Sequence, residues 1–477
     1  MDEQESDGRA AFDAYVEALI GVIGHADRAE PLRDYCLGLM MPVKRKSVEP
    51  LAAVTAPARV SAQHQSLLHF VGQAPWSDEA LIARVCDWVL PRMIERGGPI
   101  TAWIIDDTGF PKKGKHSVGV ARQYCGQLGK QDNCQVAVSL SIANEKASLP
   151  IAWRLYLPEL WAHDPELRRK AKIPDSVGFQ TKPQIALDQI RAAIATGRPT
   201  GVILADAGYG ADGAFRSGVS GLGLDYIVGV QPTLSVWRPG EEPLAPKAWS
   251  GTGRPPSRMR RSRDHKPLSV KALAQALPAD AWQSVTWREG SNVDLTSRFA
   301  AVRVRPASRD YNLTRPRAEE WLLIEWPEDD AEPLKYWLST LPADRPLRDL
   351  VATAKLRWRI ERDYRELKQE LGLGHYEGRG WRGFHHHASL CVAAYGFLIS
   401  EREAIPPSAP ARPQSGQDAP IPRGSRPRAA AHATRAARPQ LYRHHSPPDH
   451  RSARAQPAPM SVLRQDKSST PAHLVTQ

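Results

Sequence analysis

The sequence predicts an α/β protein in which an all-helical region precedes a region of strands and helices, and a β-rich segment is inserted in the latter. Residues 8–41 and 62–96 carry apolar side chains at helical spacing. Short apolar runs that end in acids occur at 102–107 and 201–206, which is typical of buried strands. Between 231 and 330, Pro and Arg interrupt short strand-like runs.

The composition of the chain indicates how many domains to expect but is weak evidence about binding partners. With 477 residues, of which 42% are hydrophobic, the chain predicts two or three domains. The net charge of +12 favours an anionic partner. However, residues 401–477 hold twelve Lys and Arg against five Asp and Glu, so +7 of the +12 lies there. Local clusters of charged residues are therefore better evidence about binding partners than the net charge.

Cysteine usage and the chain start favour a soluble, cytoplasmic protein. The five cysteines form no C-x-x-C pair, which argues against a zinc site or a disulfide framework. The segment Met1–Glu5 is acidic, unlike a signal peptide. The apolar run Leu390–Ile399 is shorter than the ~20 residues that a membrane span needs, so no membrane partner is expected.

Elements are predicted in the following order. Residues 1–95 form a helical region with a basic segment at 42–46, which could bind DNA or be part of a helical cap. Strands follow at 102–107, 135–144 and 149–157, then a helix at 181–197, a strand at 201–206, a short helix and a strand at 226–230. The insertion contributes strands at 282–288, 298–305 and 321–326, and helices return at 334–341, 347–371 and 388–400. From 401 on, Pro is frequent and large aliphatics are rare, which predicts disorder.

The helix at 347–371 contains no Gly or Pro and carries a charged face. Arg357, Glu361, Tyr364 and Lys368 are spaced by four, three and four residues, so they share that face. A carboxylate between cations suits metal-dependent phosphoryl transfer, with an oxygen ligand for the ion and positive charge for phosphates. The same pattern also fits a solvated helix with i,i+4 ion pairs.

Three acids form a candidate catalytic set. Asp107 and Asp206 each end a predicted buried strand, and Glu361 lies on the later helix. Buried carboxylates are costly unless they are paired or bind metal. Two Mg²⁺ or Mn²⁺ ions ~3.5–4 Å apart can activate a water or a 3′-hydroxyl and stabilise the leaving oxygen of a phosphodiester.

The ordered set Asp107-Thr108, Asp206 and Arg357…Glu361…Lys368 resembles the DDE transposases of bacterial insertion sequences. It is most similar to those with a β-rich insertion and a Y-(2)-R-(3)-E-(6)-K signature. The chain departs from that signature at Ala354, where the family has Tyr. The resemblance covers roughly residues 10–405.

The resemblance implies a ribonuclease-H-like core that cuts DNA at transposon ends and joins the 3′ ends to a target. It implies Asp107, Asp206 and Glu361 as catalytic residues and ligands of two Mg²⁺ or Mn²⁺ ions. The family's Asp-Thr pair selects Asp107 over Asp106, since both faces of the strand are apolar. The expected partners are double-stranded DNA and a second copy in a homodimeric synaptic complex, in a nucleoid-associated, cytoplasmic location. The expected DNA contacts are Arg357, Lys368, Tyr364, Lys112, Lys113 and Lys115.

The expected domains follow from the elements and the resemblance together. They are a helical domain at 1–95 that could bind DNA, the first part of the catalytic domain at 96–230, the β-rich insertion at 231–330, the helical completion of the catalytic domain at 331–405, and a disordered Pro/Arg-rich tail at 406–477.

Other interpretations are possible. Gly208–Gly213 reads G-x-G-x-x-G after a strand, as in dinucleotide sites, but Asp225 follows too soon and opens a strand, so we interpret the glycines as a tight turn. His385–His387 is predicted to be an exposed polar helix start. The chain could also be an inactive DNA-binding relic, or a nuclease of the same fold that does not transpose.

Overall fold

The computed structural model describes residues 3–288 and 295–404. The tail predicted to be disordered, 406–477, lies outside these residues. Within them no helix is both long and apolar enough to span a bilayer.

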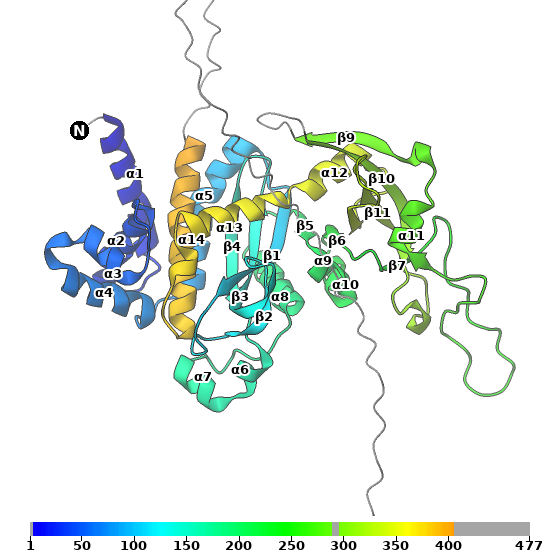
Figure 1. The fold of residues 1–477 in the computed structure, drawn as a ribbon, viewed down its shortest axis with the longest axis horizontal. Helices are drawn as coiled ribbons and strands as arrows, with labels where there is room; N and C mark the ends of the chain where they lie inside the picture. The colour runs from blue at the N-terminus through cyan, green and yellow to red at the C-terminus, as the bar shows by residue number, and fades with distance from the viewer. Residues whose placement is uncertain (1–2, 289–294, 405–477) are drawn as a thin grey trace, which may run out of the picture. The chain divides into compact units, whose positions relative to one another are not determined.

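The chain begins with helices that pack around a helix from its C-terminal part. They are α1 (Glu3–Ile20), α2 (Ala29–Met40), α3 (Val48–Thr55), α4 (Val60–Gly72) and α5 (Asp78–Gly97). Ser77 caps α5, since its hydroxyl accepts the Ala80 N–H at 3.1 Å. Helix α14 (Trp381–Ala404) contacts α2, α4, α5 and β4 (Figure 1). The first and last described helices therefore share one core.

A mixed sheet forms the centre of the protein (Figure 1). Its first strands are β1 (Ala102–Pro111), β2 (Ala121–Cys125), β3 (Lys130–Ala143), β4 (Ser148–Leu155), β5 (Val202–Ala205) and β6 (Tyr226–Gly229). Strand β3 pairs antiparallel with β1, β2 and β4, whereas β1, β5 and β6 run parallel. The order across this part is β4-β3-β1-β5-β6.

Helices follow β4 and β5. They are α6 (Glu159–His163), α7 (Pro165–Ala171), α8 (Lys182–Ala195), α9 (Ala207–Gly210) and α10 (Gly213–Gly221). Helix α8 packs on β3, where Gln189 donates to the Val138 carbonyl oxygen at 3.0 Å. Thr181 and Gln184 form a capping box that fixes where α8 begins.

The sheet continues into the segment predicted as a β-rich insertion. Its elements are β7 (Ser235–Trp237), β8 (Leu268–Ser269), α11 (Val270–Gln275), β9 (Gln283–Arg288), β10 (Leu295–Pro306) and β11 (Glu320–Glu325). The predicted helix at 334–341 is wrong, because β12 (Lys335–Ser339) is a strand between β11 and β6. Two neighbouring strands satisfy its backbone and override the helical spacing of its apolar residues.

The predicted long helix at 347–371 is two helices, α12 (Leu347–Lys355) and α13 (Trp358–Gln369), separated at Leu356 and Arg357. The last residue of α12 ties it to the insertion. The Lys355 ammonium lies 2.7 Å from a Glu325 carboxylate oxygen and 4.0 Å from the Trp287 ring centroid. This cation sits in an aromatic surrounding, which favours a fixed position for the start of α13.

The histidine triplet at the start of α14 is buried, so the prediction of an exposed helix start is wrong. His385 accepts the Leu155 N–H at 3.2 Å, and His386 stacks on Trp76 with ring centroids 3.5 Å apart. His387 contacts the Tyr35 hydroxyl at 2.9 Å. The triplet therefore joins α14 to β4 and to the N-terminal helices.

Candidate active site

The acids of β1 and β5 meet where β5 ends. These strands are parallel, with Ile104 opposite Leu204. Continuing the register two residues places Asp106 level with Asp206. Strand β1 extends beyond its predicted end at Asp107 to Pro111, because β3 continues to pair with it there.

Asp206 is held by the backbone that follows it. Its Oδ1 accepts the Gly208 N–H at 2.8 Å and the Tyr209 N–H at 3.3 Å, so it caps the single turn α9. A side chain at Gly210 would collide with the carbonyl oxygen of Gly229 on β6. Gly210 thus serves close packing beside Asp206, and the glycines of the G-x-G-x-x-G segment lie in α9 and α10.

The neighbouring acids Asp106 and Asp107 reach different helices, because successive strand residues point to opposite faces. An oxygen of Asp106 accepts from Arg357 Nη1 of α13 at 2.7 Å. The Asp107 Oδ2 atom lies 2.8 Å from Lys182 Nζ of α8. Asp106 also accepts the Asp107 N–H at 2.8 Å through its other oxygen, so both of its oxygens are engaged.

The acids of β1 and β5 are close enough to influence one another. Burial raises the pKa of Asp106 to about 6; Arg357 opposes this shift, and the charges of Asp206 and Asp107 add to it. Crowded carboxylates of this kind need a cation to share. In this structure Arg357 is the cation beside Asp106, and Lys182 is the cation beside Asp107.

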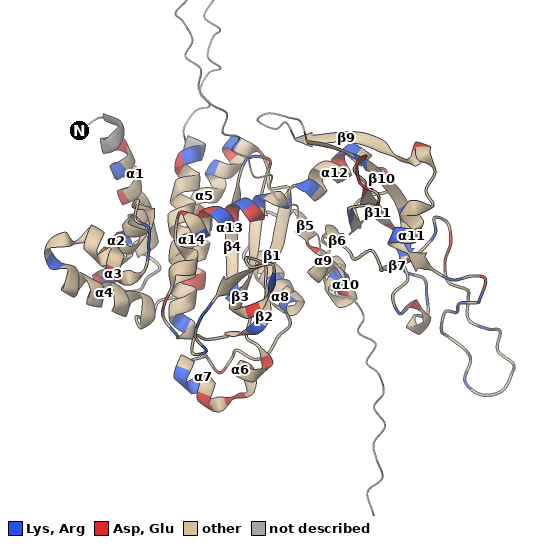
Figure 2. Ribbon diagram, in the orientation of Figure 1, with Lys and Arg blue, Asp and Glu red and all other residues tan. Residues whose placement is uncertain are grey.

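Glu361 is the exposed member of the predicted set. Its side chain is 69% exposed, and its Oε1 lies 3.5 Å from Arg357 Nη2. Arg357 therefore stands between Asp106 of β1 and Glu361 of α13. Acidic and basic residues adjoin along α13 (Figure 2).

Two tyrosines complete the buried side of the site. The Tyr364 hydroxyl lies 2.8 Å from Ser139 Oγ on β3, and the side chain is buried rather than presented to DNA. Within residues 3–288 and 295–404, the buried Tyr209 hydroxyl has no hydrogen-bond partner. Burial raises the Tyr209 pKa well above its usual range, and Asp107 and Asp106 raise it further. A metal-bound water or a phosphate oxygen beside these acids would supply the hydrogen-bond partner that this hydroxyl lacks.

The predicted DNA-contacting lysines have different surroundings. Lys368 donates to the Gly109 carbonyl oxygen at 2.8 Å, and burial lowers its pKa to about 8. Lys112 donates to the Tyr376 carbonyl oxygen at 2.8 Å. Lys113 and Lys115 are exposed. Lys113 and Lys115 are thus open to a ligand, whereas the other two are committed to the protein backbone.

Ala354, at the signature's Tyr position, is 5% exposed. Its side chain lies against the core near the end of α12. The residue at this position is therefore buried in the described part of the chain and does not offer a side chain at the surface.

The donor set suits Mg²⁺ or Mn²⁺, which prefer carboxylate oxygens. Among residues 3–288 and 295–404, no three Asp, Glu, His or Cys side chains converge on one point that could hold an ion. Asp107, Asp206 and Glu361 are instead engaged with Lys182, the α9 backbone and Arg357. The residue types and the unpartnered Tyr209 hydroxyl fit the metal, while the carboxylates would have to leave their present partners.

Comparison with known proteins gives the family. A family model described as DDE superfamily endonuclease matches residues 18–293, more than half of the chain. The chain therefore belongs to the DDE superfamily of endonucleases, in agreement with the resemblance in its sequence. The matched region ends before α13, so Glu361 lies outside it.

One relative has a more specific description. The chain is 32% identical over 196 residues to a protein of Microchaete diplosiphon described as "Probable transposase for insertion sequence element IS701". The alignment covers 41% of this chain and 47% of the relative, so the aligned part spans about half of that protein.

Sequence reasoning missed Lys182, Tyr209 and the ion pair of Asp106. The adjacent acids Asp106 and Asp107 are a sequence signal for the missed pairing, because two neighbouring carboxylates in a buried strand each need a cation. Nothing local identifies Lys182 or Tyr209, because their roles depend on how α8 and α9 pack against β1 and β5.

Proposed function

We propose that the protein is a transposase that cleaves DNA at the ends of an insertion sequence and joins the 3′ ends to target DNA. The observation that carries the proposal is the meeting of acids where β1 and β5 end, with Asp106 and Glu361 both in contact with Arg357 and Asp107 in contact with Lys182. Membership of the DDE superfamily and the relative's description as a probable transposase support it. The order β4-β3-β1-β5-β6, with its first three strands antiparallel and its last three parallel, supports a ribonuclease-H-like core.

In this proposal Asp107, Asp206 and Glu361 hold two Mg²⁺ or Mn²⁺ ions. The bound ions would supply an activated water or 3′-hydroxyl and stabilise the leaving oxygen. Asp107 is favoured over Asp106 because its side chain is 29% exposed and one oxygen has no partner among the described contacts, whereas both Asp106 oxygens are engaged.

The cations would bind and orient the DNA. Arg357 would exchange its bond to Asp106 for a phosphate near the scissile bond. Its planar guanidinium can donate to two phosphate oxygens at once. Lys113 and Lys115, which are exposed, would neutralise backbone phosphates, whereas Lys112 and Lys368 would keep their bonds to the protein backbone. The helices of 1–95 would bind DNA, and a homodimer would pair two ends. A cytoplasmic, nucleoid-associated location follows from such a substrate.

Cleavage of the element's own ends tests the proposal. Purified protein is incubated with duplexes that carry the inverted repeats flanking its coding region, with scrambled duplexes as control. We expect Mg²⁺-dependent nicking at the repeat boundary and transfer of the 3′ end to a plasmid. Equal cutting of scrambled DNA would favour a non-transposing nuclease, and binding without cutting would favour a relic.

A further inference from the structure

Helix α13 carries Glu361 but has little apolar surface with which to fix its rotation. Its buried residues are Arg359, Ile360, Asp363, Tyr364 and Leu367, of which only two are aliphatic. A helix that buries so few aliphatic side chains depends on polar contacts for its orientation.

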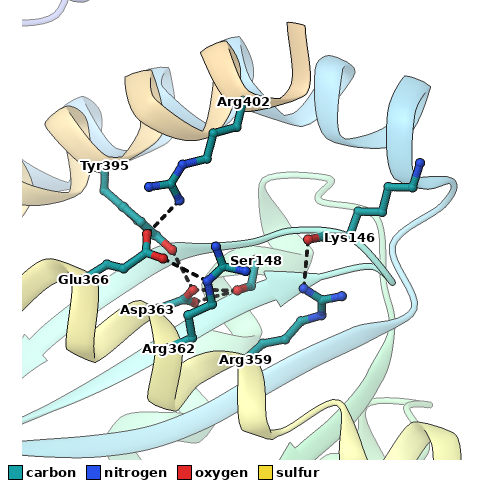
Figure 3. Close-up of polar contacts among 8 residues, drawn as sticks. All are labelled: Lys146, Ser148, Arg359, Arg362, Asp363, Glu366, Tyr395 and Arg402. Atoms are coloured by element: carbon teal, nitrogen blue, oxygen red, sulfur yellow. Dashed lines mark hydrogen bonds and ion pairs between the residues drawn. The ribbon is translucent and has the colours of Figure 1, made fainter. Parts of the chain in front are cut away.

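The most enclosed of these contacts involve Asp363, whose side chain is 1% exposed. Its Oδ1 accepts from Ser148 Oγ at 2.7 Å and from the Tyr395 hydroxyl at 2.8 Å. Its Oδ2 lies 2.8 Å from Ser148 Oγ. Ser148 opens β4 and Tyr395 lies on α14, so one carboxylate joins α13 to both elements (Figure 3).

Further links lie on the same side of α13. Arg359 donates to the Lys146 carbonyl oxygen at 2.9 Å, just before β4. Glu366 pairs with Arg402 of α14 at 2.7 Å (Figure 3). The Glu366 pair is more exposed and therefore weaker than the Asp363 contacts.

Asp363 and Glu361 lie on nearly opposite faces of the helix, since two residues correspond to about 200° of rotation. Fixing Asp363 against β4 and α14 therefore fixes the direction in which Glu361 points. A rotation of α13 by one residue would move Glu361, together with Arg357 at the start of the same helix, away from the strand acids Asp106 and Asp206.

We propose that Asp363, held by Ser148 and Tyr395, is a positioning residue that sets the rotation of α13 and so directs Glu361 to the metal site. This rests on the proposed function, in which Glu361 is a metal ligand. Asp363 acts through Glu361 and touches neither DNA nor metal.

Asn at position 363 separates geometry from charge. Its amide oxygen can accept from both Ser148 and Tyr395, and its NH₂ group can donate to Ser148 in place of the Oδ2 contact. Ala at this position removes all three contacts. Ser400→Ala is a matched control, because it removes a buried α14 hydroxyl whose bond to the Phe397 carbonyl oxygen lies within the same helix.

The experiment measures Mn²⁺ affinity of the full chain by the EPR signal of free Mn²⁺, beside end-DNA affinity and melting temperature. We expect Asp363→Ala and Glu361→Gln each to weaken Mn²⁺ binding about tenfold, with the DNA affinity of Asp363→Ala within twofold of wild type. Asp363→Asn and Ser400→Ala should bind Mn²⁺ within twofold of wild type. Lowered melting temperature with unchanged Mn²⁺ affinity in Asp363→Ala would overturn the proposal.

If Asp363→Ala does not fold, Tyr395→Phe decides. A loss of about threefold in Mn²⁺ affinity supports the positioning role, and an unchanged affinity overturns it. The Glu361→Gln variant distinguishes a failure of the proposed function from a failure of the positioning role of Asp363. Unchanged Mn²⁺ binding by Glu361→Gln would overturn the proposed function and the positioning role together, whereas a loss in Glu361→Gln alone would overturn only the role of Asp363.

Discussion

Arg357 of α13 bonds to Asp106 of β1 at 2.7 Å, across 251 residues of sequence. The side chains are 25% and 15% exposed, so the pair is largely shielded from water. The same guanidinium also lies 3.5 Å from Glu361. One arginine thus balances an acid of the sheet and the predicted catalytic acid of the helix.

Arg357→Ala should lower the free energy of unfolding by about 3 kcal/mol, because it leaves Asp106 buried without its cation. Combining it with Asp106→Asn should cost less than the sum of the two single changes. Urea unfolding of the four proteins measures this coupling. Strictly additive losses would show that the two side chains do not stabilise each other.

Asp106 and Asp107 should differ in their effect on cleavage. Asp107→Asn should reduce single-turnover cleavage of end DNA by at least about a thousandfold, because it removes a proposed metal ligand. Asp106→Asn should reduce it only about tenfold, because it affects the placement of Arg357. If Asp106→Asn has the larger effect, the first metal ligand is Asp106.

The exposed lysines of the basic turn should contribute to the salt dependence of DNA binding. Lys113→Ala and Lys115→Ala should each reduce the slope of log K against log salt by about 0.9, the value for one lost phosphate contact. Lys112→Met is the comparison, because the Lys112 ammonium is bound to the Tyr376 carbonyl oxygen. Parallel lines for Lys113→Ala and wild type would remove this turn from the DNA interface.

His387 should make the fold sensitive to acid. Burial lowers its pKa to about 4, from an ordinary value near 6.5. Because the unfolded chain binds the proton more readily, its contribution is present above about pH 6.5 and is lost as the pH falls toward 4. The expected loss is about 3 kcal/mol.

Replacing His387 by Gln isolates this contribution. Gln can donate to the Gly372 carbonyl oxygen and accept from Tyr35, as the neutral ring does, but it does not titrate in this range. Unfolding free energies of both proteins between pH 4 and 7.5 measure the difference. Equal slopes for the two would contradict the assignment of the acid sensitivity to His387.

The strand acids and the charged face of α13 could be predicted because both depend on local patterns. Apolar runs ending at Asp107 and Asp206 indicate buried strands, and the spacing of Arg357, Glu361 and Lys368 indicates one helix face. The strand β12 could not be predicted in the same way. Leu334, Trp337, Leu338 and Leu341 follow helical spacing, and the sheet neighbours that override it lie far away in sequence.

The burial of polar side chains could not be predicted from local sequence patterns either. His387 pairs with Tyr35, 352 residues away, and Asp363 pairs with Ser148, 215 residues away. A polar residue becomes a core residue when a distant partner satisfies it, and sequence spacing carries no record of that partner.

The most direct test of the account compares wild type with Glu361→Gln and Asp206→Asn in Mg²⁺-dependent, single-turnover cleavage of the element's end DNA. Both variants keep the volume of the side chain and lose the charge that would bind the ion. The account predicts that both bind end DNA with wild-type affinity and give no detectable cleavage. Cleavage at the wild-type rate by either variant would contradict the claim that Asp206 and Glu361 belong to the catalytic site.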